Sequence, residues 1–133
     1  LKEASILCGI ISATSIPVLF SAAALLNIIG QPYSGARSIF IKTLLSKRYA
    51  LPERVIEALV QYFVRTAEEA RSECPEAPAM PVLWHQSLLQ FAQRYKGELS
   101  SDQRATIESI NSMLAHAEIA PEIQRELDAA MQA

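Results

Sequence analysis

The chain has 133 residues, half of them hydrophobic, and a formal net charge of −2. This length is typical of one domain, and the hydrophobic share is large enough to bury a core, which excludes a disordered chain. The near-neutral charge argues against a dedicated nucleic-acid-binding domain, although it hides an uneven distribution of charges. We therefore predict a single domain over residues 1–133.

The first third of the chain is its most apolar part. No charged residue occurs between positions 3 and 37, and residues 6–29 are numerous enough to span a bilayer. However, Pro17 and several serines and threonines interrupt the run, and neither a basic flank nor a signal-peptide layout accompanies it. We predict two short buried helices instead, the first over about residues 2–14 and the second starting near Ile16.

Two further helices should meet at a basic corner marked by a proline. The first opens at Ser34, whose hydroxyl can cap free backbone N–H groups, and runs to about Lys47 with apolar residues around most of its circumference. The second starts at Pro52, whose missing N–H costs nothing at the first helical position. Its apolar face consists of Val55, Ile56, Leu59, Val60, Tyr62 and Phe63, and its solvated face of Arg54, Glu57, Gln61 and Arg65.

The sequence then turns polar before the next helix. Residues 65–80 contain several glutamates and two prolines, and we predict a loop there, with residues 71–80 as its polar centre. A fifth helix should begin at Pro81 and place Trp84 in the core. His85 falls on the same apolar face, where a buried histidine with a hydrogen-bond partner is expected rather than a ligand or a base.

The last two predicted helices follow Ser100 and Pro121. Ser100 with Gln103 resembles a capping box for the sixth helix. The seventh carries only a thin apolar stripe, Ile123 and Leu127, and should be the least firmly docked. Prolines at the starts of helices predict an all-α fold of six or seven helices in antiparallel hairpins, with a HEAT-like, α-solenoid-like stack.

The sequence carries no motif typical of an enzyme. A phosphate loop, a nucleophile elbow, zinc-ligand spacing and an HExxH motif are all missing. Cys8 and Cys74 have no CxxC spacing, which favours two free thiols in a reducing intracellular compartment. We predict a non-enzymatic protein with no cofactor, metal or small-molecule substrate.

Basic residues concentrate around the central corner. Residues 37–54 carry five of them against the single acid Glu53, whereas from residue 98 onward seven acids face two arginines. We predict that these five residues contact RNA or a partner: Arg37, Lys42, Lys47, Arg48 and Arg54.

Two alternatives stay open for this corner. Lys47 and Arg48 lie in a predicted last helical turn, where they serve either as complements to the helix dipole or as contacts to RNA phosphates. Arg37 lies in a first turn, where the dipole disfavours a cation, so a phosphate or carboxylate of a partner is expected beside it. From the residues alone, the chain is either a scaffold that touches RNA and protein or a groove that grips a peptide.

Several blocks in a fixed order resemble a known family. They are SIPVL at residues 15–19, YSGA, SIF and KRYALPERV through the central corner, PVLWHQ at 81–86, QRYK at 93–96, and PEI and REL after residue 120. Together they are similar to the C-terminal region of the bystin family of ribosome-assembly proteins. Because that family has a long upstream region, we expect the chain to be a C-terminal fragment of a longer protein.

The resemblance implies a non-enzymatic assembly factor for the small (40S) ribosomal subunit. It implies action in the nucleolar small-subunit processome and on pre-40S particles, with support of 18S rRNA processing. The implied partners are pre-18S rRNA, snoRNA, small-subunit ribosomal proteins and other assembly factors, and no membrane. The implied location is the nucleolus and nucleus, with passage to the cytoplasm. The alternative is a helical peptide-binding adaptor in a cell-adhesion complex.

Overall fold

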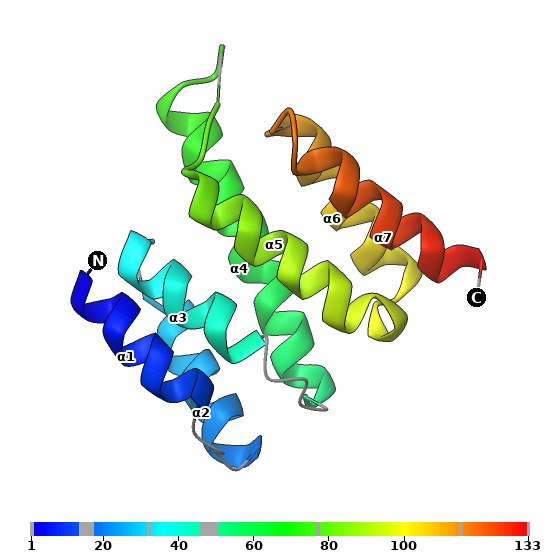
Figure 1. Cartoon of the computed structure of the whole chain (residues 1–133). Helices are drawn as coiled ribbons and strands as arrows, with labels where there is room; N and C mark the ends of the chain where they lie inside the picture. The colour runs from blue at the N-terminus through cyan, green and yellow to red at the C-terminus, as the bar shows by residue number, and fades with distance from the viewer. Residues whose placement is uncertain are drawn as a thin grey trace.

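A computed structural model describes residues 2–13, 18–31, 33–45, 51–76, 78–114 and 116–132. In these residues the chain is all-α, as predicted, with seven α-helices, one short 3-10 helix and no strand. The elements are α1 (Lys2–Ala13), α2 (Val18–Ile29), α3 (Gly35–Leu45), α4 (Glu53–Glu73), α5 (Val82–Tyr95), η1 (Lys96–Glu98), α6 (Ser101–Met113) and α7 (Ala120–Gln132) (Figure 1). None of these helices is long and apolar enough to cross a membrane.

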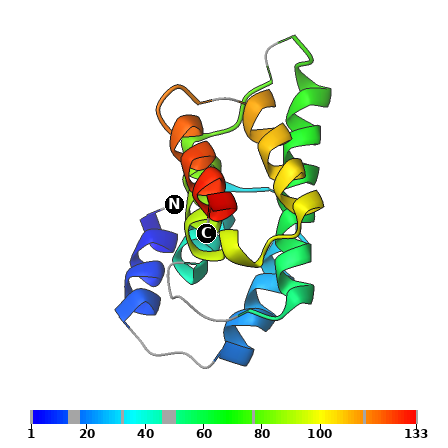
Figure 2. The ribbon, with the colours of Figure 1, turned by 90° about the vertical axis from the view of Figure 1, so that its right-hand side faces the viewer.

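The helices form two layers that alternate along the chain. In one layer α1, α3, α5 and α7 contact one another in that order, and in the other α2, α4 and α6 do the same. Contacts between α2 and α3 and between α6 and α7 join the layers (Figure 2). Each of these two joining contacts is made by a pair of consecutive helices. These contacts define no superhelical rotation, so the HEAT-like stack stays a prediction.

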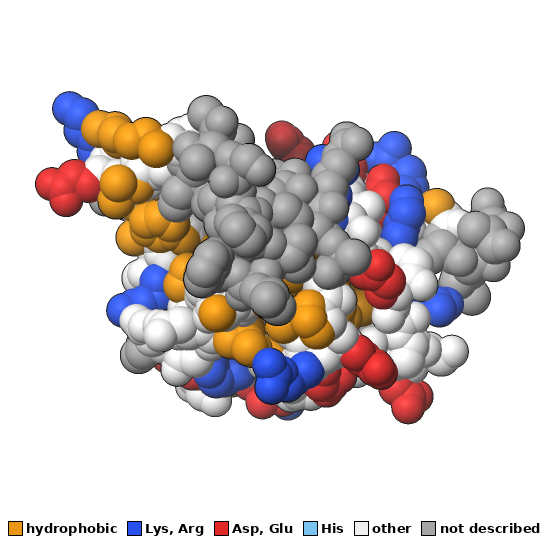
Figure 3. Space-filling view, turned by 90° about the horizontal axis from the view of Figure 1, so that it is seen from below, with side chains coloured by type: hydrophobic (Ala, Val, Ile, Leu, Met, Phe, Trp, Pro, Cys, Tyr) orange, Lys and Arg blue, Asp and Glu red, His pale blue; other side chains and the backbone are white. Residues whose placement is uncertain are grey.

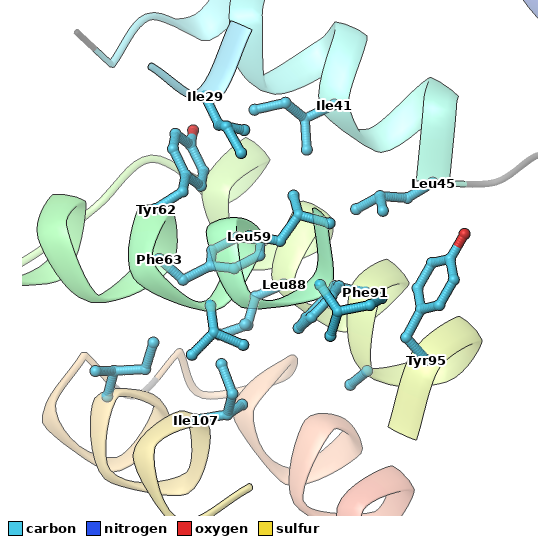
Figure 4. Close-up of a cluster of buried hydrophobic side chains, with 14 of the residues drawn as sticks. Ile29, Ile41, Leu45, Leu59, Tyr62, Phe63, Leu88, Phe91, Tyr95 and Ile107 are labelled. Atoms are coloured by element: carbon cyan, nitrogen blue, oxygen red, sulfur yellow. The ribbon is translucent and has the colours of Figure 1, made fainter. Parts of the chain in front are cut away.

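An aromatic cluster between the layers forms the centre of the core. The ring centroid of Phe63 on α4 lies 5.8 Å from that of Trp84 and 5.6 Å from that of Phe91, both on α5. Figure 4 shows Ile41 of α3 and Ile107 of α6 reaching the same cluster from opposite sides. The apolar face predicted for α4 is buried in full, and the placement of Trp84 in the core is confirmed.

Two serine caps fix the starts of helices as predicted. The Arg37 backbone N–H donates to Ser34 Oγ at 3.1 Å at the start of α3. At the start of α6, the Gln103 N–H donates to Ser100 Oγ at 3.1 Å, and the Ser100 N–H donates to Gln103 Oε1 at 2.9 Å. This reciprocal pair is the capping box.

The prolines lie close to their predicted positions. Pro52 and Pro81 are N-cap residues with ψ angles of 150° and 154°, so each helix begins one residue later than predicted. This extended conformation belongs to an N-cap residue and not to the first helical position. The predicted start of the second helix near Ile16 and the predicted end of the third at Lys47 lie outside the described residues.

The predicted polar loop is wrong in its first part, because α4 continues to Glu73. Thr66, Ala67 and Ala70 are buried along this extension. Trp84 of α5 packs here and donates from Nε1 to Thr66 Oγ1 at 2.7 Å. Residues 71–73 are therefore helical, and the connection to α5 begins at Cys74.

The prediction that α1 is buried is also wrong. Ile6, Leu7 and Ile10 are 57%, 51% and 59% exposed, and among the side chains described on α1 only that of Ala4 is buried. The main contact of α1 is with α3, and α1 lies at the outer edge of its layer. With one neighbouring helix, only a narrow stripe of α1 can be covered.

Candidate interaction surface

The two basic side chains of α3 leave the helix on different sides. Lys42 Nζ donates to Gln86 Oε1 of α5 at 3.4 Å. Arg37 lies five residues earlier on the same helix, which turns its side chain by about 140° from that of Lys42. The structure therefore does not bring Arg37 and Lys42 together.

The remaining basic residues of the corner are separated from these two. Arg54 is exposed in the first turn of α4. Lys47 and Arg48 lie outside the described residues, so their role as helix caps or phosphate contacts stays a prediction. Figure 3 shows one face of the molecule, on which the basic side chains of the described residues are interspersed with acidic ones. On that face the described residues form no continuous basic patch.

Arg65 has a role that the sequence did not indicate. Its Nη2 donates to the backbone oxygens of Ile29 at 2.7 Å and of Gln31 at 3.1 Å, at the C-terminal end of α2. Its guanidinium carbon also lies 5.8 Å from the ring centroid of Tyr62. The last turn of α2 has no basic residue of its own, so Arg65 supplies the positive charge that complements the end of this helix. The lack of a basic residue in the last turn of α2 was a sequence signal that another segment must supply the positive charge.

A groove with a volume of about 380 Å³ lies beside Arg65, between α2 and α4. Its surface is mostly apolar, with polar groups contributed by α4. It is lined by Leu26, Ile29, Gly30, Ala58, Gln61, Tyr62 and Arg65, and we call it the α2–α4 groove.

A second hollow, of about 340 Å³, has a different character. It lies between α4 and the segment that leads into α5, and Glu69 and Glu73 give it two carboxylates. Tyr33 and Met80 contribute to its apolar part. The two hollows therefore differ in charge, since the α2–α4 groove carries an arginine and this one carries acids.

His85 is the buried histidine that the sequence predicted. It is 4% exposed and lies near the backbone of Met80, and its Nδ1 is buried without a hydrogen-bond partner among the described residues. Burial is the main cause that lowers the pKa of His85. The ring of His116, whose centroid lies 5.3 Å away, lowers this pKa further, and the backbone of Met80 raises it. His116 Nδ1 accepts the backbone N–H groups of Glu118 at 3.2 Å and Ile119 at 3.3 Å. The pair therefore connects α5 with the turn before α7.

The described residues gather no group of three histidine, cysteine or acidic side chains that could hold a metal ion. The surface features that they do present are the separated cations of the central corner, the α2–α4 groove and the exposed side of α1. These features suit contact with other macromolecules.

Comparisons with known proteins give a family match over the whole chain. A family model described as Bystin matches residues 1–133. The chain is 48% identical over 130 residues to Bystin of Drosophila melanogaster and 47% identical over 131 residues to Bystin of Homo sapiens, and each match covers 98% of this chain and 28% of the relative. An uncharacterized protein of Schizosaccharomyces pombe is 44% identical over 127 residues, which cover 96% of this chain and 27% of that protein. The chain thus spans little more than a quarter of the length of these relatives.

Proposed function

Since the chain belongs to the bystin family, we propose that it acts as a non-enzymatic assembly factor for the small ribosomal subunit. The family match over residues 1–133 is the observation that carries this proposal, together with the function that the resemblance implies. The names of the relatives give no sign of an enzymatic activity.

The proposed role includes place and partners. The protein joins nucleolar precursors of the small subunit, stays on pre-40S particles, supports 18S rRNA processing and reaches the cytoplasm with those particles. Its partners are pre-18S rRNA, snoRNA, small-subunit ribosomal proteins and other assembly factors. Several helix faces are exposed, and the face in Figure 3 carries no large basic patch among the described residues. These features favour a scaffold with several small contacts rather than a protein that binds only RNA.

The RNA contacts in this proposal come from the cations of the central corner. Of those in the described part of the chain, Arg54 is the most accessible, and Lys42 is half-buried beside α5. Phosphate contacts carry no sequence information and release counterions. The affinity of this chain for RNA should therefore be independent of base sequence and should fall steeply as salt rises.

Charge reversal in the full-length protein tests these contacts. Lys42→Glu with Arg54→Glu should reduce recovery of the protein on pre-40S particles, whereas the matched control Lys2→Glu with Arg125→Glu should not. Arg54→Glu places an acid in the first turn of α4, where the helix dipole favours it, so the fold should persist. If both variants sediment with the particles as well as wild type, the central corner is not the contact.

A second candidate function is favoured by the α2–α4 groove, which has the dimensions of a site for a peptide side chain. It is the helical peptide-binding adaptor of a cell-adhesion complex. Affinity purification of the full-length protein separates the two candidates. Recovery of pre-rRNA and small-subunit proteins supports the assembly factor, and recovery of membrane adhesion proteins without pre-rRNA supports the adaptor.

A further inference from the structure

We propose that the α2–α4 groove binds a segment of a partner protein in which an apolar side chain stands next to an acidic one. The feature that carries this inference is the position of the Arg65 guanidinium at the edge of an open apolar surface. The inference rests on the second candidate function in using the same groove, and it adds the chemistry of the bound segment. It involves other residues and another class of partner than the proposed RNA contacts.

The apolar part of the groove is open at its surface and closed beneath. Leu26 and Ala58 are partly exposed, whereas Ile29 and Tyr62 below them are 5% and 3% exposed. An apolar side chain that enters removes apolar surface from water on both partners. A nucleic-acid backbone gains nothing from such a surface, since its phosphates need donors and cations. The groove therefore favours a protein segment over RNA.

Arg65 provides a fixed positive charge at this groove. Its bonds to the oxygens of Ile29 and Gln31 both come from Nη2, and a guanidinium has five N–H donors. Throughout the described ranges no carboxylate forms an ion pair with Arg65, and no acidic residue lines the groove. Backbone oxygens set the position of this guanidinium, and its other donors face no acid. It is therefore suited to bind a carboxylate of a partner.

Tyr62 forms part of the closed side of the groove. Figure 4 shows its ring reaching from α4 toward Ile29 of α2. Its hydroxyl is enclosed and has no hydrogen-bond partner among the described residues. The apolar floor formed by Ile29 and Tyr62 and the guanidinium of Arg65 therefore meet in one groove, as in sites that fix the orientation of a ligand.

The binding test uses short peptides of defined chemistry. A pool of synthetic octapeptides with leucine or phenylalanine next to aspartate is titrated into the ¹⁵N-labelled chain, followed by a matched pool with lysine in place of aspartate and by a uridine oligonucleotide. The acidic pool should shift the amide signals of Gly30, Ala58 and Gln61, and the lysine pool should not. The inference is overturned if the acidic pool leaves these signals in place, if both pools shift them equally, or if the oligonucleotide alone shifts them.

A variant that strengthens binding separates recognition from folding. Gln61→Lys adds a cation beside the groove, so it should tighten binding of the acidic pool by about 1.5- to 5-fold. Gln61→Glu should weaken it by a similar factor. The matched controls are Gln93→Lys and Gln93→Glu at an exposed glutamine of α5, and these should leave the affinity unchanged. Equal effects at positions 61 and 93 would assign the binding to overall charge and overturn the inference.

Discussion

At the scale of single residues, Trp84 of α5 joins its layer to α4. It is fully enclosed against Phe63 and bonded to Thr66. Trp84→Ala should lower the free energy of unfolding by about 3 to 5 kcal/mol, because it leaves a cavity and removes a buried hydrogen bond. Trp84→Phe keeps an aromatic ring and should cost less. Urea denaturation measures both, and a near-neutral Trp84→Ala would contradict the placement of this residue in the core.

His85 should make the fold sensitive to acid. Its pKa is lowered by burial and by His116, so the unfolded chain binds a proton on this residue at a higher pH than the folded chain does. The contribution of His85 to the free energy of unfolding is therefore present above the ordinary histidine pKa of about 6.5. This contribution is lost as the pH falls through the lower pKa of the folded state.

The effect of His85 is measured by comparing urea midpoints at about pH 7.5 and about pH 5.5. The midpoint of the wild-type chain should drop more than that of His85→Phe, which keeps an aromatic ring but cannot bind the proton. The other titrating groups are common to both chains, so they cancel in the comparison. An equal drop in the two chains would show that His85 does not contribute.

Candidate site residues were only partly predictable from the sequence. Arg54 was placed on a solvated face and is exposed. Arg65 was placed on the same face, yet it bonds to Ile29 and Gln31, which lie more than 30 residues earlier in the chain. A helical wheel reports the period of one helix and not the neighbour beside it. The α2–α4 groove was invisible for the same reason, since it exists only where two helices meet.

At the scale of elements, the capping box of α6 gives a clean prediction. Ser100→Ala removes the side-chain oxygen that accepts the Gln103 N–H and should lower the free energy of unfolding by about 0.5 to 2 kcal/mol. Ser101→Ala at the next, exposed position is the control and should change little. Equal losses in the two variants would indicate that the box contributes nothing of its own.

Most helices could be located from apolar periodicity, prolines and serine caps, and the errors have physical causes. The end of α4 was missed because Thr66, Ala67 and Ala70 are small and only weakly apolar, and Thr66 meets its partner Trp84 on another helix. The burial of α1 was overestimated because an apolar composition shows what a helix can bury and not whether a neighbour is present. In both cases the missing information lies in contacts between elements.

At the scale of the whole molecule, helix geometry separates features that are neighbours in sequence. Lys42 and Arg37 share α3 but leave it on different sides, and Lys42 donates to Gln86 of α5. Glu126 of the acidic C-terminal part of the chain forms an ion pair with Lys96 of η1, with the two charged atoms 2.6 Å apart. A chain with dispersed cations and an apolar groove is suited to several modest contacts at once, which is the behaviour expected of a scaffold in a large assembly.

Depletion of the full-length protein from its own cells tests the assembly role most directly. The quantity to measure is mature 18S rRNA relative to the rRNA of the large subunit. Depletion should lower this ratio and let precursors of 18S rRNA accumulate, and re-expression of the wild-type protein should restore it. An unchanged ratio, with no precursor accumulating after the protein is gone, would contradict a role in small-subunit assembly.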